Sequence, residues 1–237
     1  MFKDSFSKNK NSNSYVQQRE DDFRKMESWR LFRIMAEFVE GFEMMAQVSP
    51  AISIFGSART KQDNVYYQWA EETAERIAQH GFNVITGGGL GIMEAANKGA
   101  SKVEGRASIG LNIDLPFEQV PNEYINHLIN FRYFFVRKVM FSKYAAGIIV
   151  LPGGYGTFDE LFENLTLIQT KKIHQMPVVL MGKKFWKGLI DWMKDEVYEQ
   201  EKNICPGDLD LIQITDDPKE AVDFVVHHPS VQNQTLQ

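Results

Sequence analysis

Cysteine is nearly absent from this 237-residue chain, which contains only Cys205. A single thiol excludes an internal disulfide and suits a reducing compartment, so we expect a cytoplasmic protein. Because Cys205 lies in the loop-like stretch NICPGD, we do not expect it to be a catalytic nucleophile.

Long hydrophobic runs are also missing. No stretch approaches the roughly 18 consecutive apolar residues that a transmembrane helix needs. The first 22 residues lack the apolar segment of a signal peptide and predict a polar tail. We therefore expect a soluble protein with no membrane partner.

Basic residues are fewer than acidic residues as well. The 26 lysines and arginines are outnumbered by 31 aspartates and glutamates, and the net charge of −5 gives no support to binding of polymeric nucleic acid. The five histidines show no metal-ligand spacing, so we expect neither a metal nor a cofactor. The hydrophobic share of 43%, by contrast, is enough for a globular core.

From residue 51 onward, short apolar runs alternate with helical patterns. We expect strands at 51–57, 82–88, 107–113, within 127–134, and at 147–153, 176–182 and 209–215. We expect helices at 64–81, 90–102, 134–145, 157–172, 185–200 and 218–226. This alternation, with strands apolar on both faces, predicts an α/β fold with a doubly wound, mostly parallel, Rossmann-like sheet.

The expected domain covers residues 51–228 and is followed by a C-terminal tail at 229–237. Residues 1–50 form an extension, in which residues 23–48 have the apolar spacing of an amphipathic helix. That helix either packs on the domain's own core or faces another subunit of an oligomer.

Familiar phosphate-binding motifs are lacking. The first strand-to-helix turn has no G-x-G-x-x-G, and the chain has no G-x-x-x-x-G-K-[ST]. Three turns at the carboxyl ends of expected strands are nevertheless unusual: FGSAR (55–59), TGGGLGIM (86–93) and LPGGYGT (151–157). Ligands of such sheets bind at these ends, and amides at helix N-termini bind anions. We therefore expect a small phosphorylated ligand near Ser57, Gly153, Gly154, Gly156 and Thr157.

Two charged residues near these turns each allow two interpretations. Thr157 and Glu160 have the spacing of a capping box, but Glu160 could instead lie beside the sugar of a bound nucleotide and act on it. Arg137 lies in the apolar stretch FFVRKVMF, where it either forms a structural ion pair or contacts the substrate. Asp159 is a weaker candidate than Glu160.

The motifs GGGLGIMEAANKGA, RKVM and PGGYGTFDE, in this order and spacing, resemble the Lonely Guy (LOG) family, and the resemblance covers roughly residues 51–226. It implies a phosphoribohydrolase that cleaves nucleoside 5′-monophosphates to free base and ribose 5-phosphate, as a homodimer or higher homo-oligomer. It places the catalytic roles on Arg137 and Glu160. The substrate-binding positions that it implies are Gly56, Ser57, Gly87, Gly88, Gly89, Gly91, Met93, Lys138, Gly153, Gly154, Gly156 and Thr157.

The segment FFV (134–136) and the N-terminal extension differ from the short plant enzymes of that family and indicate a bacterial-type subgroup. Its substrates would be AMP-like nucleotides, with cytokinin ribotides as one option. The alternative function is a non-catalytic sensor module that uses the same fold to bind a nucleotide without turnover.

Overall fold

The computed structural model describes residues 11–115 and 120–235 of the chain. These residues belong to two compact units, Met1–Glu40 and Gly41–Gln237. In the described ranges we find no helix with the length and hydropathy of a membrane span.

The N-terminal helix α1 runs from Asn11 to Met45, so it begins well before the expected start at residue 23. Residues 11–22, expected to belong to a polar tail, are therefore helical, and residues 1–10 lie outside the described residues. No proline or glycine interrupts residues 11–40, and polar residues such as glutamine, arginine and glutamate are good helix formers. The polar composition of residues 11–22 is therefore compatible with a helix.

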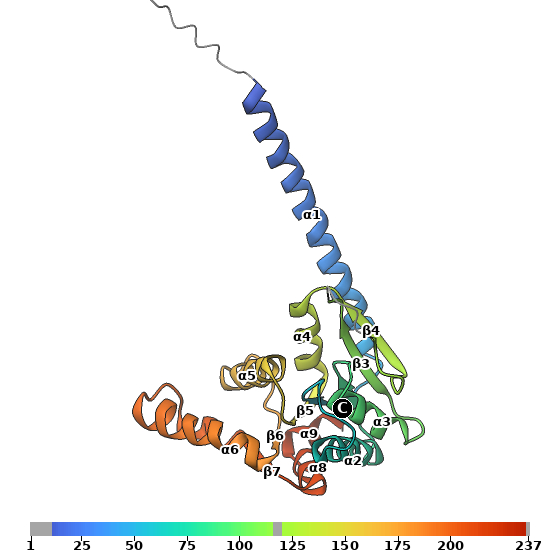
Figure 1. The fold of residues 1–237 in the computed structure, drawn as a ribbon, viewed down its shortest axis with the longest axis vertical. Helices are drawn as coiled ribbons and strands as arrows, with labels where there is room; N and C mark the ends of the chain where they lie inside the picture. The colour runs from blue at the N-terminus through green and yellow to red at the C-terminus, as the bar shows by residue number, and fades with distance from the viewer. Residues whose placement is uncertain (1–10, 116–119, 236–237) are drawn as a thin grey trace, which may run out of the picture. The chain divides into compact units, whose positions relative to one another are not determined.

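The sheet of the second unit has seven parallel strands in the order β4-β3-β2-β1-β5-β6-β7, which confirms the predicted fold class (Figure 1). The strands are β1 Ala51–Phe55, β2 Asn83–Thr86, β3 Ser108–Ile113, β4 His127–Phe131, β5 Ala145–Val150, β6 Val178–Met181 and β7 Ile212–Thr215. From β1 the chain continues to β2 on one side, and it later returns to β5 on the other side. The crevice between the carboxyl ends of β1 and β5 is therefore the topological switch point, where such sheets bind ligands.

The helices after α1 are α2 Val65–Gln79, α3 Ile92–Ser101, α4 Phe134–Tyr144, α5 Tyr155–Gln169, α6 Lys183–Trp192, the π-helix η1 Met193–Gln200, α7 Pro206–Leu209, α8 Pro218–Val226 and α9 Pro229–Thr235. Helix α9 corrects the prediction of a C-terminal tail at 229–237. Val231 on this helix is fully buried in the core. Pro229 occupies the first helical position, where its fixed φ favours a helix start.

The core lies on both faces of the sheet. Ile52 and Ile54 of β1 pack with residues of α2, α3 and α8 on one face. Phe55, which points the opposite way because side chains alternate along a strand, contacts Phe141 of α4 with ring centroids 5.1 Å apart. Met45 and Val48 are also buried in this unit, so the domain begins before the expected boundary at residue 51.

Candidate active site

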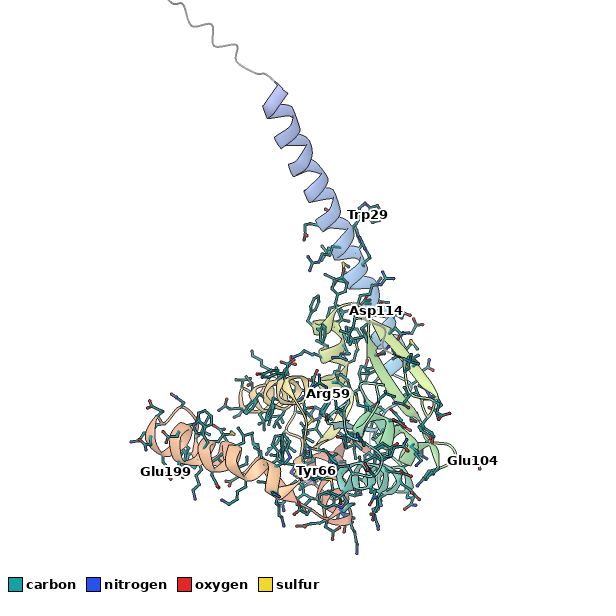
Figure 2. The ribbon with its side chains drawn as sticks, in the orientation of Figure 1. Trp29, Arg59, Tyr66, Glu104, Asp114 and Glu199 are labelled. Carbon is teal, nitrogen blue, oxygen red and sulfur yellow. The ribbon has the colours of Figure 1, made fainter. Side chains whose placement is uncertain are left out.

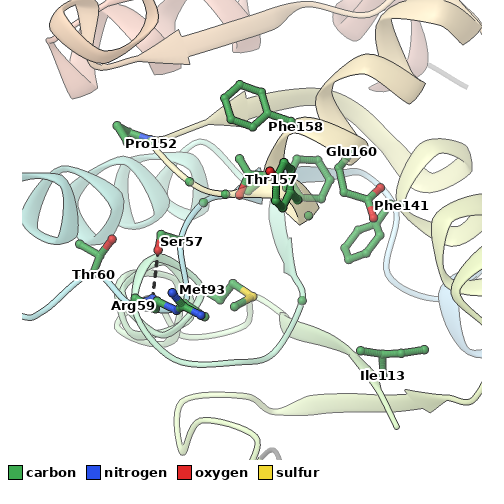
Figure 3. Close-up of a pocket in the computed structure, with 18 of the residues that line it drawn as sticks. Ser57, Arg59, Thr60, Met93, Ile113, Phe141, Pro152, Thr157, Phe158 and Glu160 are labelled. Carbon is green, nitrogen blue, oxygen red and sulfur yellow. Dashed lines mark hydrogen bonds between the residues drawn. The ribbon is translucent and has the colours of Figure 1, made fainter. Parts of the chain in front are cut away.

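A cavity of about 1000 Å³ lies at the switch point between β1 and β5 (Figure 3). It is lined by Phe55, Gly56, Ser57, Ala58, Arg59, Thr60, Gly87, Met93, Ile113, Leu115, Phe134, Arg137, Phe141, Pro152, Gly153, Gly154, Tyr155, Gly156, Thr157, Phe158, Glu160 and Phe185. The three predicted turns therefore meet around one pocket, which is large enough for a nucleotide.

Main-chain hydrogen bonds connect the three turns to one another. The amide of Ser57 donates to the carbonyl of Pro152 over 3.0 Å, and the carbonyl of Ser57 accepts from the amide of Ile92 over 3.0 Å. A methyl group on Gly56 would lie 2.5 Å from Ile92, and one on Gly91 would lie 2.4 Å from the Ser57 carbonyl oxygen. Gly91 also has a φ of 65°, a conformation that favours glycine. These two glycines allow the turns to pack closely.

The middle turn contributes Gly87 and Met93 to the pocket wall, whereas Gly88, Gly89 and Gly91 do not line it. The side-chain amide of Asn122 donates to the carbonyl oxygen of Gly89 over 2.9 Å, and it also donates to the buried Asn97 over 3.0 Å. Gly88 and Gly89, behind the wall, thus take part in a buried polar network that fixes the turn.

The glycines of the third turn differ in what a side chain would meet. A methyl group on Gly153 would lie 2.1 Å from Thr157 Oγ1, so Gly153 is required by packing. A methyl group on Gly154 or Gly156 would meet nothing within 4 Å, and neither residue has a positive φ. Packing therefore does not explain these two glycines. Both line the cavity, where a Cβ atom would occupy the space next to the backbone amides.

Helix α5 begins in this third turn, with Gly154 as its N-cap residue. The amide of Thr157 donates to the carbonyl of Gly154 over 2.9 Å, so it is not available to an anion as the sequence suggested. The amides of Gly154, Tyr155 and Gly156 precede the first intrahelical donors and have no acceptor within the helix. Together with the positive end of the helix dipole, they form a cradle for an anion.

Glu160 is a buried carboxylate of this pocket. Its side chain is 5% exposed, and its Oε2 atom is buried without a hydrogen-bond partner among the described residues. Burial raises the pKa of Glu160 to about 7, although the nearby charges of Arg137 and Lys138 act to lower it. The capping-box interpretation is wrong, because α5 starts at Tyr155 and Thr157 is therefore not the N-cap residue.

Arg137 reaches the pocket from α4. Its guanidinium carbon lies 5.0 Å from the ring centroid of Phe134 and 5.6 Å from that of Phe141. Burial lowers the pKa of Arg137, and the charges of Glu160 and Asp159 partly offset this effect. In the described chain Arg137 forms no ion pair, and its buried Nε atom has no hydrogen-bond partner. The alternative of a structural ion pair is therefore wrong.

Lys138, the neighbour of Arg137, does not line the pocket. Its ammonium nitrogen lies 2.8 Å from Asp159 Oδ1 and 2.8 Å from Glu163 Oε2. Lys138 was expected to bind substrate, but here it neutralises two carboxylates of α5. Asp159, the weaker catalytic candidate, is occupied by the same ion pair.

Sequence reasoning missed Arg59 and the aromatic part of the wall. Arg59 lines the cavity, and so do Phe55, Phe141 and Phe158. A signal for Arg59 was present, because it is a cation within the FGSAR turn at the carboxyl end of a strand. The described residues contain no group of three or more His, Cys, Asp or Glu side chains that could hold a metal ion.

The fold and the site together define a Rossmann-like protein with an anion cradle and a buried carboxylate on the same helix. Residues 93–225 match the family model described as "Possible lysine decarboxylase". The chain belongs to this family, and the predicted resemblance to the LOG proteins is confirmed.

Two relatives illustrate the range of the family. The chain is 29% identical over 151 residues to cytokinin riboside 5′-monophosphate phosphoribohydrolase LOG2 of Arabidopsis thaliana, covering 62% of this chain and 70% of that protein. It is 31% identical over 127 residues to the pyrimidine/purine nucleotide 5′-monophosphate nucleosidase of Escherichia coli K12, covering 50% of this chain but 28% of that protein.

Solved structures show the same fold. The molybdenum cofactor carrier protein of Chlamydomonas reinhardtii superposes with a TM-score of 0.54 at 22% identity, covering 79% of this chain and 99% of that one. The molybdenum cofactor binding protein of Rippkaea orientalis gives a TM-score of 0.52 at 22% identity, covering 74% and 94% of the two chains. At these identities the likeness concerns the fold alone.

Proposed function

We propose that this protein hydrolyses the N-glycosidic bond of nucleoside 5′-monophosphates and releases free base and ribose 5-phosphate. The observation that carries this proposal is the buried, unpartnered carboxylate of Glu160, which lines the same cavity as the glycine cradle. The names of the Arabidopsis and E. coli relatives, a phosphoribohydrolase and a nucleotide nucleosidase, support the same reaction.

The substrate's phosphate binds to the free amides at the start of α5, and its sugar extends toward Glu160. Glu160 lies five positions after Tyr155, which corresponds to about 7.5 Å along a helix. A ribose 5-phosphate bridges this kind of separation, so the anion cradle and the carboxylate can act on opposite ends of one substrate.

Cleavage of the glycosidic bond passes through a state with positive charge on the sugar, as in glycoside hydrolysis. The carboxylate of Glu160 attracts this charge more strongly than it attracts the neutral sugar of the ground state, and such a difference is what lowers the barrier. A pKa of about 7 also allows Glu160 to accept a proton from the attacking water. Arg137, whose charge interacts with that of Glu160, orients the carboxylate or the substrate.

The family description "Possible lysine decarboxylase" suggests another chemistry, namely decarboxylation with pyridoxal phosphate. That chemistry needs a lysine amine that forms a Schiff base with the cofactor. The described residues that line the cavity include no lysine, and Lys138 is held by two carboxylates outside it. These residues do not fit that cofactor.

Incubation with AMP, GMP, CMP and a cytokinin ribotide, followed by chromatography of the released base, tests the proposal. We expect base release from at least one nucleotide, and relative kcat/KM values identify the preferred base. The substitution Glu160→Gln keeps the shape of the side chain but removes its charge. It should lower kcat by at least ~10²-fold and leave nucleotide binding nearly unchanged.

Asp159→Asn is the matched control, because it removes a carboxylate one residue away that does not line the cavity. We expect its kcat to stay within a few-fold of the wild-type value. Nucleotide binding by the wild-type protein without release of any base would instead favour the sensor alternative.

We also propose that the protein is a cytoplasmic homodimer. Three apolar side chains of α4 support an oligomer, because Phe134 is 49%, Phe135 is 47% and Val139 is 39% exposed in the single chain. The exposed free thiol of Cys205 suits a reducing compartment. Light scattering on the full chain in solution, with twice the mass of 27.3 kDa as the expected result, tests the dimer.

A further inference from the structure

Arg59 provides an unused cation at the cavity wall. Its side chain is exposed, and in the described part of the chain it takes part in no ion pair. Arg59 lines the main cavity, and it also lines an adjoining groove together with Lys61. The proposed reaction, as described above, assigns no role to this guanidinium.

The charges of the cavity indicate what Arg59 can bind. A phosphate monoester carries a charge of roughly −1.5 to −2 at neutral pH, whereas a helix N-terminus offers only about half a positive charge. Arg59 and Arg137 are the two permanently charged cations among the described lining residues. Arg137 lies among phenylalanine rings and interacts with the charge of Glu160, so it belongs to the sugar end.

The backbone holds Arg59 close to the anion cradle. The Arg59 amide donates to Ser57 Oγ over 3.0 Å, and the Ser57 amide donates to the carbonyl of Pro152, directly before the glycine turn, over 3.0 Å. Figure 3 shows Arg59 beside Ser57 at one end of the pocket, and Glu160 beside Phe141 at the other. Figure 2 labels the same arginine among the side chains of the second unit.

We propose that Arg59 binds the 5′-phosphate of the substrate and makes the enzyme select nucleotides over nucleosides. This inference rests on the proposed function, because it assigns a specificity role within the same site. The guanidinium offers paired N–H donors that match two phosphate oxygens. Since the phosphate does not change during hydrolysis of the glycosidic bond, this contact is equally strong in the ground state and the transition state.

The substitution Arg59→Gln tests the proposal through its effect on two substrates. We expect kcat/KM for AMP to fall about 10- to 100-fold, almost entirely through a higher KM, because one charge-assisted contact is lost. The value for adenosine should not change, so the AMP-to-adenosine ratio should fall by the same factor. Arg59→Lys keeps the charge but loses the paired donors, and should give an intermediate loss.

Lys61→Gln is the matched control, because Lys61 carries the same charge and lines the adjoining groove but not the main cavity. We expect its KM for AMP to stay within about twofold of the wild-type value, as for surface charges that are not in contact with the ligand. An equal loss in both variants would show a general effect of net charge and would overturn the assignment.

Calorimetric titration separates failure of this inference from failure of the proposed hydrolysis. We expect Arg59→Gln to weaken binding of ribose 5-phosphate about 10- to 100-fold relative to the wild-type protein, whether or not AMP is hydrolysed. Such weakening in a protein that releases no base would support the phosphate contact and reject the enzyme. Unchanged affinity for ribose 5-phosphate, or no binding of it to the wild-type protein, would overturn the role of Arg59.

Discussion

The raised pKa of Glu160 predicts that this side chain destabilises the folded protein at neutral and alkaline pH. An ordinary glutamate has a pKa of 4.5, whereas burial raises the value here to about 7. The folded state therefore binds the proton more tightly than the unfolded state. Compared with a variant that has a neutral side chain at position 160, the wild-type protein is equally stable below about pH 4.5. Its free energy of unfolding falls as the pH rises from there through about 7, and the deficit is constant above that.

The difference in pKa sets the size of this effect. At about 1.4 kcal/mol for each pKa unit, it corresponds to a change of about 3.5 kcal/mol in the free energy of unfolding. The variant Glu160→Gln cannot ionise, so its advantage over the wild type should grow by this amount between pH 4.5 and pH 8.5. For a protein of this size, the difference in Tm should grow by roughly 7–14 °C.

Differential scanning calorimetry of both proteins across this pH range measures the effect. The exposed carboxylate of Glu104 offers a control, Glu104→Gln, for the same change in net charge. A Tm difference between Glu160→Gln and wild type that does not depend on pH would refute the reasoning, because it would mean that the carboxylate is not desolvated in the fold.

Further predictions concern the neighbours of Glu160 in the site. The charge of Arg137 lowers the pKa of Glu160, so Arg137→Gln should shift the rising limb of the pH profile of kcat/KM from about 7 to higher pH. An unshifted limb would show that the charge of Arg137 does not affect the ionisation of Glu160. Gly156→Ala should raise the KM for AMP because the methyl group enters the cradle, whereas stability, measured as Tm, should be unchanged or increase, since alanine favours a helix by up to about 1 kcal/mol. Gly153→Ala should instead lower the free energy of unfolding by about 1–3 kcal/mol in a denaturant titration, because the new methyl group overlaps Thr157; equal stability of the two variants would contradict this distinction.

Much of the fold could be read from the sequence because the central strands β1, β2, β5 and β6 are buried along their whole length and each is followed by a helical pattern. Element ends were less predictable. The start of α5 depends on how the turn after β5 packs against Ser57, so the T-x-x-E spacing alone could not show that the helix begins before Thr157. Helix α9 was missed because its short sequence is polar apart from Val231, and burial of that residue depends on the assembled core.

The sequence by itself determined the sheet, the meeting of three glycine-containing turns at its carboxyl edge, and the presence of charged residues next to them. It could not determine which charge of each adjacent pair faces the ligand. Neighbouring residues on a helix point about 100° apart, so Arg137 enters the cavity while Lys138 pairs with carboxylates, and Glu160 lines the wall while Asp159 does not. Only the tertiary structure removes one carboxylate from water and leaves it unpaired, and that loss of hydration is what shifts its pKa toward neutrality.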